Sequence, residues 1–125
     1  MADKYNLGTI HQGILATEIY NGKATSTTAT YNLTESYKNF KFLLVFCEVN
    51  NGTYEHSNKA FTIVDVSSVD GNTNEFRVSQ DSGALFFSIQ FNFKSNTTFN
   101  ISSASTTGTT PGWTSPCIYK IVGIN

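Results

Sequence analysis

The stretch Ala84-Leu-Phe-Phe-Ser-Ile-Gln-Phe-Asn-Phe93 decides the fold class, because its apolar side chains recur at every second position. Successive side chains of a β-strand point to opposite faces, whereas those of a helix return to one face after three or four residues. The stretch therefore predicts a strand with one face in a core. The side chains on that face are Leu85, Phe87, Ile89, Phe91 and Phe93.

Seven further segments resemble strands and are separated by short turns rich in Gly and Asn, and no segment shows helical periodicity. This rhythm predicts an all-β fold, an antiparallel β-sandwich of about eight strands with a jelly-roll-like arrangement. We expect one domain over residues 1–125, with 1–12 as a lead segment. The seven segments are residues 13–20, 24–33, 40–49, 60–66, 75–80, 97–103 and 117–125.

The connections between these segments carry their own signals. Asn21-Gly22 predicts a hairpin turn between the first two strands. Thr34 or Ser36 could begin a short helical turn before residue 40. The segment 40–49 is the most apolar, which predicts a central strand buried on both faces.

The sequence closes on the apolar strand Cys117-Ile-Tyr-Lys-Ile-Val-Gly-Ile-Asn125, which must be held in a sheet or against another chain. We expect it to pair with the strand at 40–49, and such an ending suits the far tip of a larger assembly. That pairing would make Cys47 and Cys117 neighbours. Buried free thiols are the simpler expectation, and a disulfide is the alternative.

Charged residues make up only 14% of the chain and the net charge is -1. Ser, Thr and Asn supply most of the polarity instead. A nucleic-acid binder needs a basic patch, so this class is disfavoured. No stretch is long enough to span a membrane, and the first residues do not resemble a signal peptide.

The sequence holds no recognisable catalytic motif. The histidines, His11 and His56, do not lie near a nucleophile motif, and with two cysteines they lack the spacing of a zinc site. Glu18, Glu48 and Asp65 could converge only if the fold brought them together. We therefore expect no enzyme, no metal and no cofactor. The Asx-rich stretch 70–75 faintly resembles a calcium loop, and a hairpin turn explains it better.

Aromatic residues in loops are the candidates for ligand binding. Trp113 lies between two prolines, and Tyr54 and His56 share a polar loop. A ring with a polar group can stack on a sugar or anchor an interface. The alternatives are that Trp113 plugs one end of the sandwich and that Tyr54 and His56 are solvated loop residues.

Three stretches together resemble the distal receptor-binding domains of tailed-bacteriophage tail fibres. They are Tyr31-Asn-Leu-Thr-Glu-Ser-Tyr-Lys-Asn-Phe-Lys-Phe-Leu-Leu-Val-Phe46, the alternating strand 84–93, and the ending Ile118-Tyr-Lys-Ile-Val-Gly-Ile124. The resemblance implies a β-sandwich head at the virion tail tip. It also implies a homotrimer that binds a glycan or protein on the host cell surface. Family binding residues lie in variable loops, so none is carried over.

Two other functions stay open from the sequence. One is a soluble lectin-like carbohydrate-binding module, extracellular or at a cell surface. The other is a structural, self-assembling β-protein without a ligand. All three share a low-charge surface rich in Thr, Ser and Asn on an all-β body.

Overall fold

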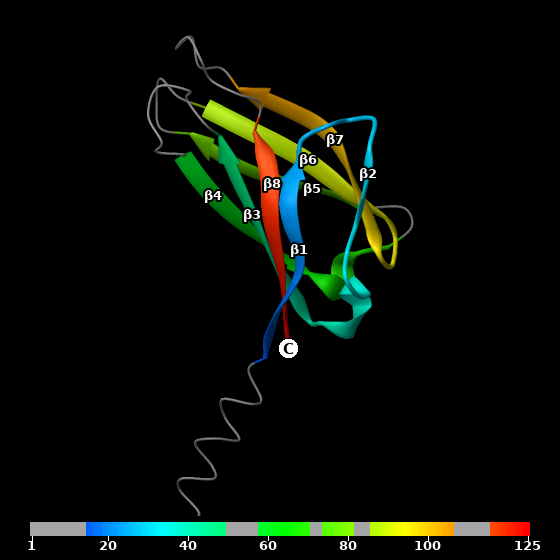
Figure 1. The fold of residues 1–125 in the computed structure, drawn as a ribbon. Coiled ribbons are helices and arrows are strands. Elements are labelled where there is room, and N and C mark those ends of the chain that lie inside the picture. Colours follow the sequence, from blue (N-terminus) through cyan, green and yellow to red (C-terminus); the bar gives the residue numbers. More distant parts are fainter. Residues whose placement is uncertain (1–14, 50–57, 71–73, 82–85, 107–115) are drawn as a thin grey trace, which may run out of the picture.

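The computed structural model describes residues 15–49, 58–70, 74–81, 86–106 and 116–125. They form two antiparallel four-stranded sheets packed face to face (Figure 1). Sheet A has the order β1-β8-β3-β4 and sheet B the order β2-β7-β6-β5. The predicted all-β sandwich of eight strands is confirmed. The strands are β1 (Ala16–Ala24), β2 (Thr30–Asn32), β3 (Phe42–Val49), β4 (Asn58–Asp65), β5 (Glu75–Asp81), β6 (Phe86–Ser95), β7 (Thr98–Thr106) and β8 (Cys117–Ile124).

The core lies between the sheets and follows the period of two. In β6 the alternating residues Phe87, Ile89, Phe91 and Phe93 are buried, as predicted. The core-facing side chains of sheet A include Ile19, Leu43, Val45, Val64, Ile118 and Ile121. Burying each large aliphatic or aromatic side chain contributes about 1.5–3 kcal/mol to folding, so this layer dominates the stability.

The last strand pairs with β3, as the sequence predicted. Phe42 lies opposite Ile124 and Leu44 opposite Val122. On its other edge β8 pairs with β1, so it runs between the first and third strands. The backbone N–H of Asn125 donates to the carbonyl of Leu15 over 3.1 Å, and the C-terminus lies beside the start of β1 (Figure 1).

The predicted hairpin at Asn21-Gly22 is wrong. β1 continues through these residues to Ala24, and a register shift against β8 between Asn21 and Ala24 accommodates them. The second strand is also shorter than expected and belongs to the other sheet, where it pairs with β7. The chain changes sheets over residues 25–29, where the Tyr31 hydroxyl accepts from two backbone N–H groups.

The short helical turn is confirmed. It is the 3₁₀ helix η1 (Tyr37–Asn39), and Ser36 caps it by accepting from the Lys38 N–H over 3.2 Å. A second such turn, η2 (Val66–Ser68), follows β4 and is capped in the same way by Asp65.

β3 is central in sheet A, but the expectation that both its faces are buried is wrong. Leu43, Val45 and Cys47 face the core, whereas Phe42 is 43% exposed. Leu44 and Phe46 are half-buried on that same outer side. No other layer of the described residues covers this side.

Gly123 marks a close contact in the last strand. A side chain at this position would collide with the ring of Phe40, which is buried under β8. The Phe40 ring lies at the end of η1, where its backbone N–H donates to the carbonyl of Tyr37. The absence of a side chain at Gly123 therefore lets the η1 connection pack on sheet A.

We expect Gly123→Ala to lower the free energy of unfolding by about 1–3 kcal/mol, because the added methyl group overpacks the Phe40 ring. Gly22→Ala is the matched control. The side chain added there meets the hydroxyl end of Tyr20, which can shift more easily than a buried ring. Urea unfolding measures both, and equal losses for the two variants would contradict this role of Gly123.

Candidate functional site

The residues that the sequence singled out for binding, Trp113, Tyr54 and His56, lie outside the described residues, as does His11. Their role stays a prediction. The described residues offer three surface features instead: an apolar sheet face, a pocket at one end of it, and a polar patch on the opposite sheet.

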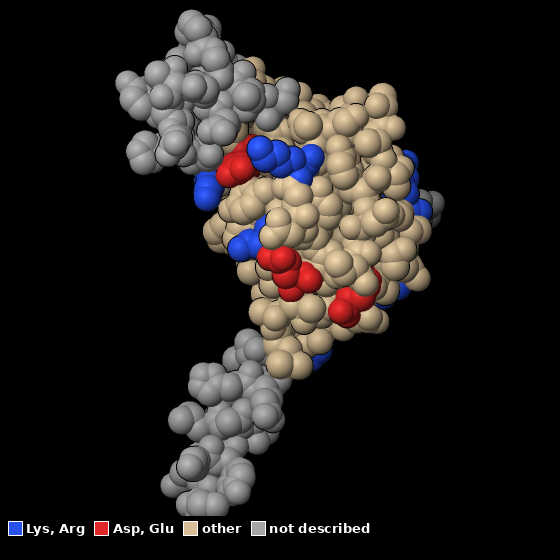
Figure 2. Space-filling model, in the orientation of Figure 1, with Lys and Arg blue, Asp and Glu red and all other residues tan. Residues whose placement is uncertain are grey.

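The outer side of sheet A is apolar across three of its four strands, β8, β3 and β4. We call it the apolar face. Phe61 and Ile63 are each 60% exposed there. On the side seen in Figure 2, charged side chains form small separate groups on a mainly uncharged surface. An apolar area of this kind is typical of a contact surface. Its residues are Phe42, Leu44, Phe46, Phe61, Ile63, Val122 and Ile124.

Aromatic rings and two lysines are in contact at the end of the apolar face that contains Phe46. The Phe46 ring centre lies 6.0 Å from that of Phe61 and 6.0 Å from that of Tyr119. Lys120 Nζ lies 4.9 Å from the Phe46 ring centre, and Lys59 Nζ lies 5.4 Å from that of Tyr119. These distances suit cation–π attraction, which keeps both ammonium groups at the edge of the apolar surface.

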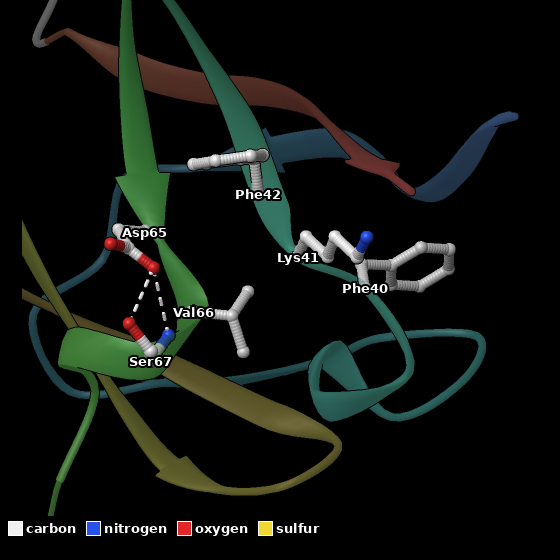
Figure 3. A pocket seen from close by; sticks show the side chains of 6 residues that line it. All are labelled: Phe40, Lys41, Phe42, Asp65, Val66 and Ser67. Atoms are coloured by element: carbon white, nitrogen blue, oxygen red, sulfur yellow. Dashed lines mark hydrogen bonds between the residues drawn. The ribbon is translucent and has the colours of Figure 1, made fainter. Parts of the chain in front are cut away.

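A pocket of about 420 Å³ lies at the other end of the apolar face, between the start of β3 and the end of β4. Figure 3 shows Phe42 and Val66 on its apolar side and Asp65 beside Ser67 on its polar side. Phe40 and Lys41 complete the lining.

The polar groups of this pocket bind one another. The Asp65 carboxylate accepts from the Ser67 backbone N–H over 3.0 Å and from the Ser67 hydroxyl over 2.7 Å (Figure 3). Activation of a serine nucleophile needs a base such as histidine, and both histidines lie outside the described residues. The arrangement caps η2 and offers an apolar recess, which can hold an apolar group of a partner.

The outer side of sheet B is polar, and we call its centre the polar patch: Glu75, Arg77, Gln90, Asn92, Asn100 and Ser102. Strand register brings these residues together from β5, β6 and β7. Asn92 lies opposite Glu75 on one side and opposite Asn100 on the other. Gln90 lies opposite Arg77 in the neighbouring row.

Hydrogen bonds hold part of the polar patch in place. The Ser102 hydroxyl donates to Glu75 Oε1 over 2.8 Å. Turning the Gln90 amide so that its nitrogen faces Glu75 satisfies both of its neighbours: the nitrogen then donates to the same Glu75 oxygen over 3.2 Å, and the amide oxygen accepts from Arg77. By contrast, the side-chain oxygens of Asn92 and Asn100 are shielded and accept no hydrogen bond from the described residues. The accessible groups of the polar patch are therefore those of Glu75, Arg77 and Ser102, which are exposed and suit a ligand rich in hydroxyl or amide groups.

The acidic residues weighed as a possible catalytic set do not converge. Glu48 lies opposite Lys59 at one end of the β3–β4 pair, and Asp65 lies opposite Phe42 at the other end. Glu18 is on β1, opposite Val122. Within the described ranges, no group of three or more His, Cys, Asp or Glu side chains could hold a metal ion.

Cys47 and Cys117 are buried free thiols on neighbouring strands, as expected. Glu48, the residue after Cys47, lies opposite Cys117. Burial raises the pKa of the Cys47 thiol far above its usual range, and Cys117 and Glu48 raise it further. Burial and then Glu48 also raise the pKa of Cys117. Neither thiol is therefore an activated nucleophile.

No protein-family model matches the sequence, and a search of curated proteins finds no significant match. In the part of the chain that the structure describes, no helix is long and apolar enough to cross a membrane. The resemblance to tail-fibre tips therefore stays a prediction.

The sequence did not identify the polar patch, although it correctly predicted a strand at residues 75–80. The available signal was the polar residue at every second position of three strands. What was missing was the register that sets Glu75, Asn92 and Asn100 in one row.

The two cysteines give a test of the core. At pH 8 we expect both thiols to resist alkylation in the folded protein and to react fully in denaturant, because thiolates form only when burial is lost. Mass spectrometry after iodoacetamide treatment counts the labelled thiols. Rapid labelling of either cysteine without denaturant would contradict their burial.

The raised pKa of Cys47 also predicts a pH dependence. The unfolded thiol ionises near pH 8.5–9 while the folded thiol keeps its proton, so stability is complete below that pH and falls above it. Cys47 alone should contribute a loss of about 1.4 kcal/mol per pH unit. Urea unfolding between pH 8 and 10 measures the slope, and Cys47→Ala, although less stable overall, should show a shallower slope. An unchanged slope in Cys47→Ala would contradict the shift.

Proposed function

We propose that this chain is a non-enzymatic binding module of the tail-fibre-tip type, which attaches to a glycan or protein on a host cell surface. The observation that carries the proposal is the contrast between its two outer faces. One is apolar and favours contact with other subunits, and the other presents hydrogen-bonding groups to a ligand. The corresponding location is the tail tip of a virion.

The polar patch supports the ligand side of the proposal. Glu75 and Gln90 supply acceptors, and Arg77 and Gln90 supply planar donors. These groups lie on adjacent strands of a sheet, which positions them more rigidly than loops would. Sugars present many hydroxyl groups at short spacing, so such a surface can engage several of them. The loop residues Trp113, Tyr54 and His56 are further candidates for the same contact.

The apolar face supports the assembly side. A module that acts alone gains nothing from leaving Phe61 and Ile63 mostly exposed, whereas subunit contacts would bury them. The homotrimer implied by the resemblance stays a prediction that light scattering tests. A stable monomer would favour the lectin-like alternative instead.

The binding test uses the fluorescently labelled domain on a glycan array and on candidate host cells. We expect Arg77→Ala to weaken binding about tenfold or more, because a hydrogen bond from a charged group is lost. Lys94→Ala is the control, since Lys94 is an exposed cation on the same sheet that lies outside the polar patch.

Two loop variants distinguish ligand binding by the polar patch from ligand binding by the loops. Loss of binding in Trp113→Ala or Tyr54→Ala, with Arg77→Ala unaffected, would move the contact to the loops. Absence of binding to any glycan or cell, or failure of the domain to protect cells from a phage that carries it, would refute the proposed function.

A further inference from the structure

β4 is an edge strand with an unusual surface. Among the described residues its only sheet neighbour is β3, with which it pairs in unbroken register from Asn58 to Asp65. Phe61 and Ile63 are the most exposed large apolar side chains of the described residues. Edge strands are usually protected by central charges, proline or a bulge. The central part of β4 has none of these.

The backbone of β4 presents its free hydrogen-bonding groups at these same two residues. The Val66 N–H donates to the Lys41 carbonyl over 3.0 Å, which continues the β3–β4 ladder. In an antiparallel pair the hydrogen-bonded positions alternate, so Val64 and Thr62 also bond toward β3. Phe61 and Ile63 therefore direct their N–H and C=O groups toward the open edge.

The outward side chains of β4 are, in order, Lys59, Phe61, Ile63 and Asp65. The apolar pair thus has a positive charge at one end and a negative charge at the other. A second β4 laid antiparallel about a two-fold axis at Thr62 places each Lys59 opposite an Asp65 and each Phe61 opposite an Ile63. Opposite charges and aromatic–β-branched pairs are favourable cross-strand neighbours. The strand is thus complementary to its own copy.

This register is also the one that the backbone allows. It pairs Phe61 with Ile63, and both have their hydrogen-bonding groups at the open edge, so each pair can exchange two N–H···O bonds. A slip of two residues in one direction would set Lys59 opposite Ile63, and in the other direction Phe61 opposite Asp65. Both slips lose the charge pairs and bring a charge against an apolar side chain.

We propose that β4 pairs antiparallel with β4 of a second copy of this chain, which joins two copies of sheet A into one continuous sheet. The contact is isologous, as in most two-fold assemblies. The pairing extends the apolar face across the two-fold axis. Phe61, whose ring lies against that of Phe46, belongs to this face in each copy and would lie beside the axis. The pairing does not depend on the proposed host-binding function.

The present contacts of the two charged residues are compatible with this pairing. Lys59 is exposed, and its contact is the ring of Tyr119. Asp65 is exposed while it caps η2 through Ser67. The Ser68 hydroxyl donates to the Asp65 carbonyl, so the backbone ladder of the new pair centres on Phe61 and Ile63.

The first experiment measures mass by sedimentation and light scattering over a concentration series. The pairing doubles whatever unit the rest of the chain forms: a monomer becomes a dimer and a trimer becomes a hexamer. We expect Lys59→Asp to weaken the affinity of the two copies about tenfold. The new carboxylate would lie opposite Asp65 of the other copy, and the two-fold axis makes this repulsive contact occur twice. Asp65→Lys should weaken the affinity similarly, and the double variant K59D/D65K should restore it.

Lys94→Asp is the matched control, because it reverses an exposed charge on sheet B and should leave the doubling unchanged. Asp65→Lys also removes the cap of η2, so circular dichroism and thermal unfolding check the fold of every variant. Lys59→Asp alone is decisive in any case, since Lys59 is exposed and makes no core contact.

The second experiment reads the register. Thr62 would face its own copy in a non-hydrogen-bonded pair with Cα atoms about 4.5 Å apart, within the roughly 4.4–6.8 Å that a disulfide spans. Thr62→Cys should therefore form a covalent dimer on mild oxidation. Phe61→Cys should not, because its copies would lie diagonally and farther apart.

Restoration by the double variant together with the Thr62→Cys cross-link would establish the pairing. A mass that never doubles up to millimolar concentration would overturn it. So would a doubling that is insensitive to Lys59→Asp, or a cross-link in Phe61→Cys but not in Thr62→Cys. Loss of glycan or cell binding would refute the proposed function alone and leave the mass data unaffected.

Discussion

The insertion of β8 between β1 and β3 is the constraint on which the rest of the structure depends. β8 is paired along both edges, and its own side chains Ile118 and Ile121 are fully buried in the core. Among the described strands β1 has no other sheet neighbour, so it belongs to sheet A only through β8. Since β8 and β1 are distant in sequence, sheet A must form through long-range contacts, which are slow to establish during folding. The contact of Gly123 with Phe40 then joins this strand to the η1 connection.

Only the inward-facing side chains of the two sheets form the core. The outward-facing side chains can therefore differ in polarity between sheet A and sheet B. Sheet B uses them for amides, hydroxyls, a glutamate and an arginine. Sheet A uses them for Phe, Leu, Ile and Val. Solvation alone would favour polar residues on both sides, and the apolar choice on sheet A agrees with the proposed contact between copies of the chain. The two sides of one small sandwich can in this way serve assembly and recognition separately.

The sequence was sufficient where side-chain alternation is local. It correctly predicted the strands around Phe91 and Ile101 and the pairing of the final strand with β3. It failed at Asn21-Gly22, because a bulge against β8 is a tertiary feature that overrides a turn preference. It also misjudged β3, since an apolar pattern on both sides of a strand does not distinguish a second layer from an exposed contact surface.

The candidate site was harder to predict for a related reason. Loop aromatics such as Trp113 can be chosen from residue type alone, and they stay predictions. The polar patch depends on cross-strand register, because Glu75 and Asn100 become neighbours only through Asn92 on the strand between them. Sequence spacing within one strand contains no information about that alignment.

The scarcity of charge gives each charged residue more influence over how such a surface associates. With 14% charged residues, Ser, Thr and Asn supply most of the solvation, and they discriminate poorly between alternative strand registers. An exposed apolar strand on such a surface could associate in many registers. A Lys at one end and an Asp at the other penalise every slipped register, because a slip brings a charge against an apolar side chain. On β4, therefore, the two charges contribute specificity, while the apolar residues between them contribute most of the attraction.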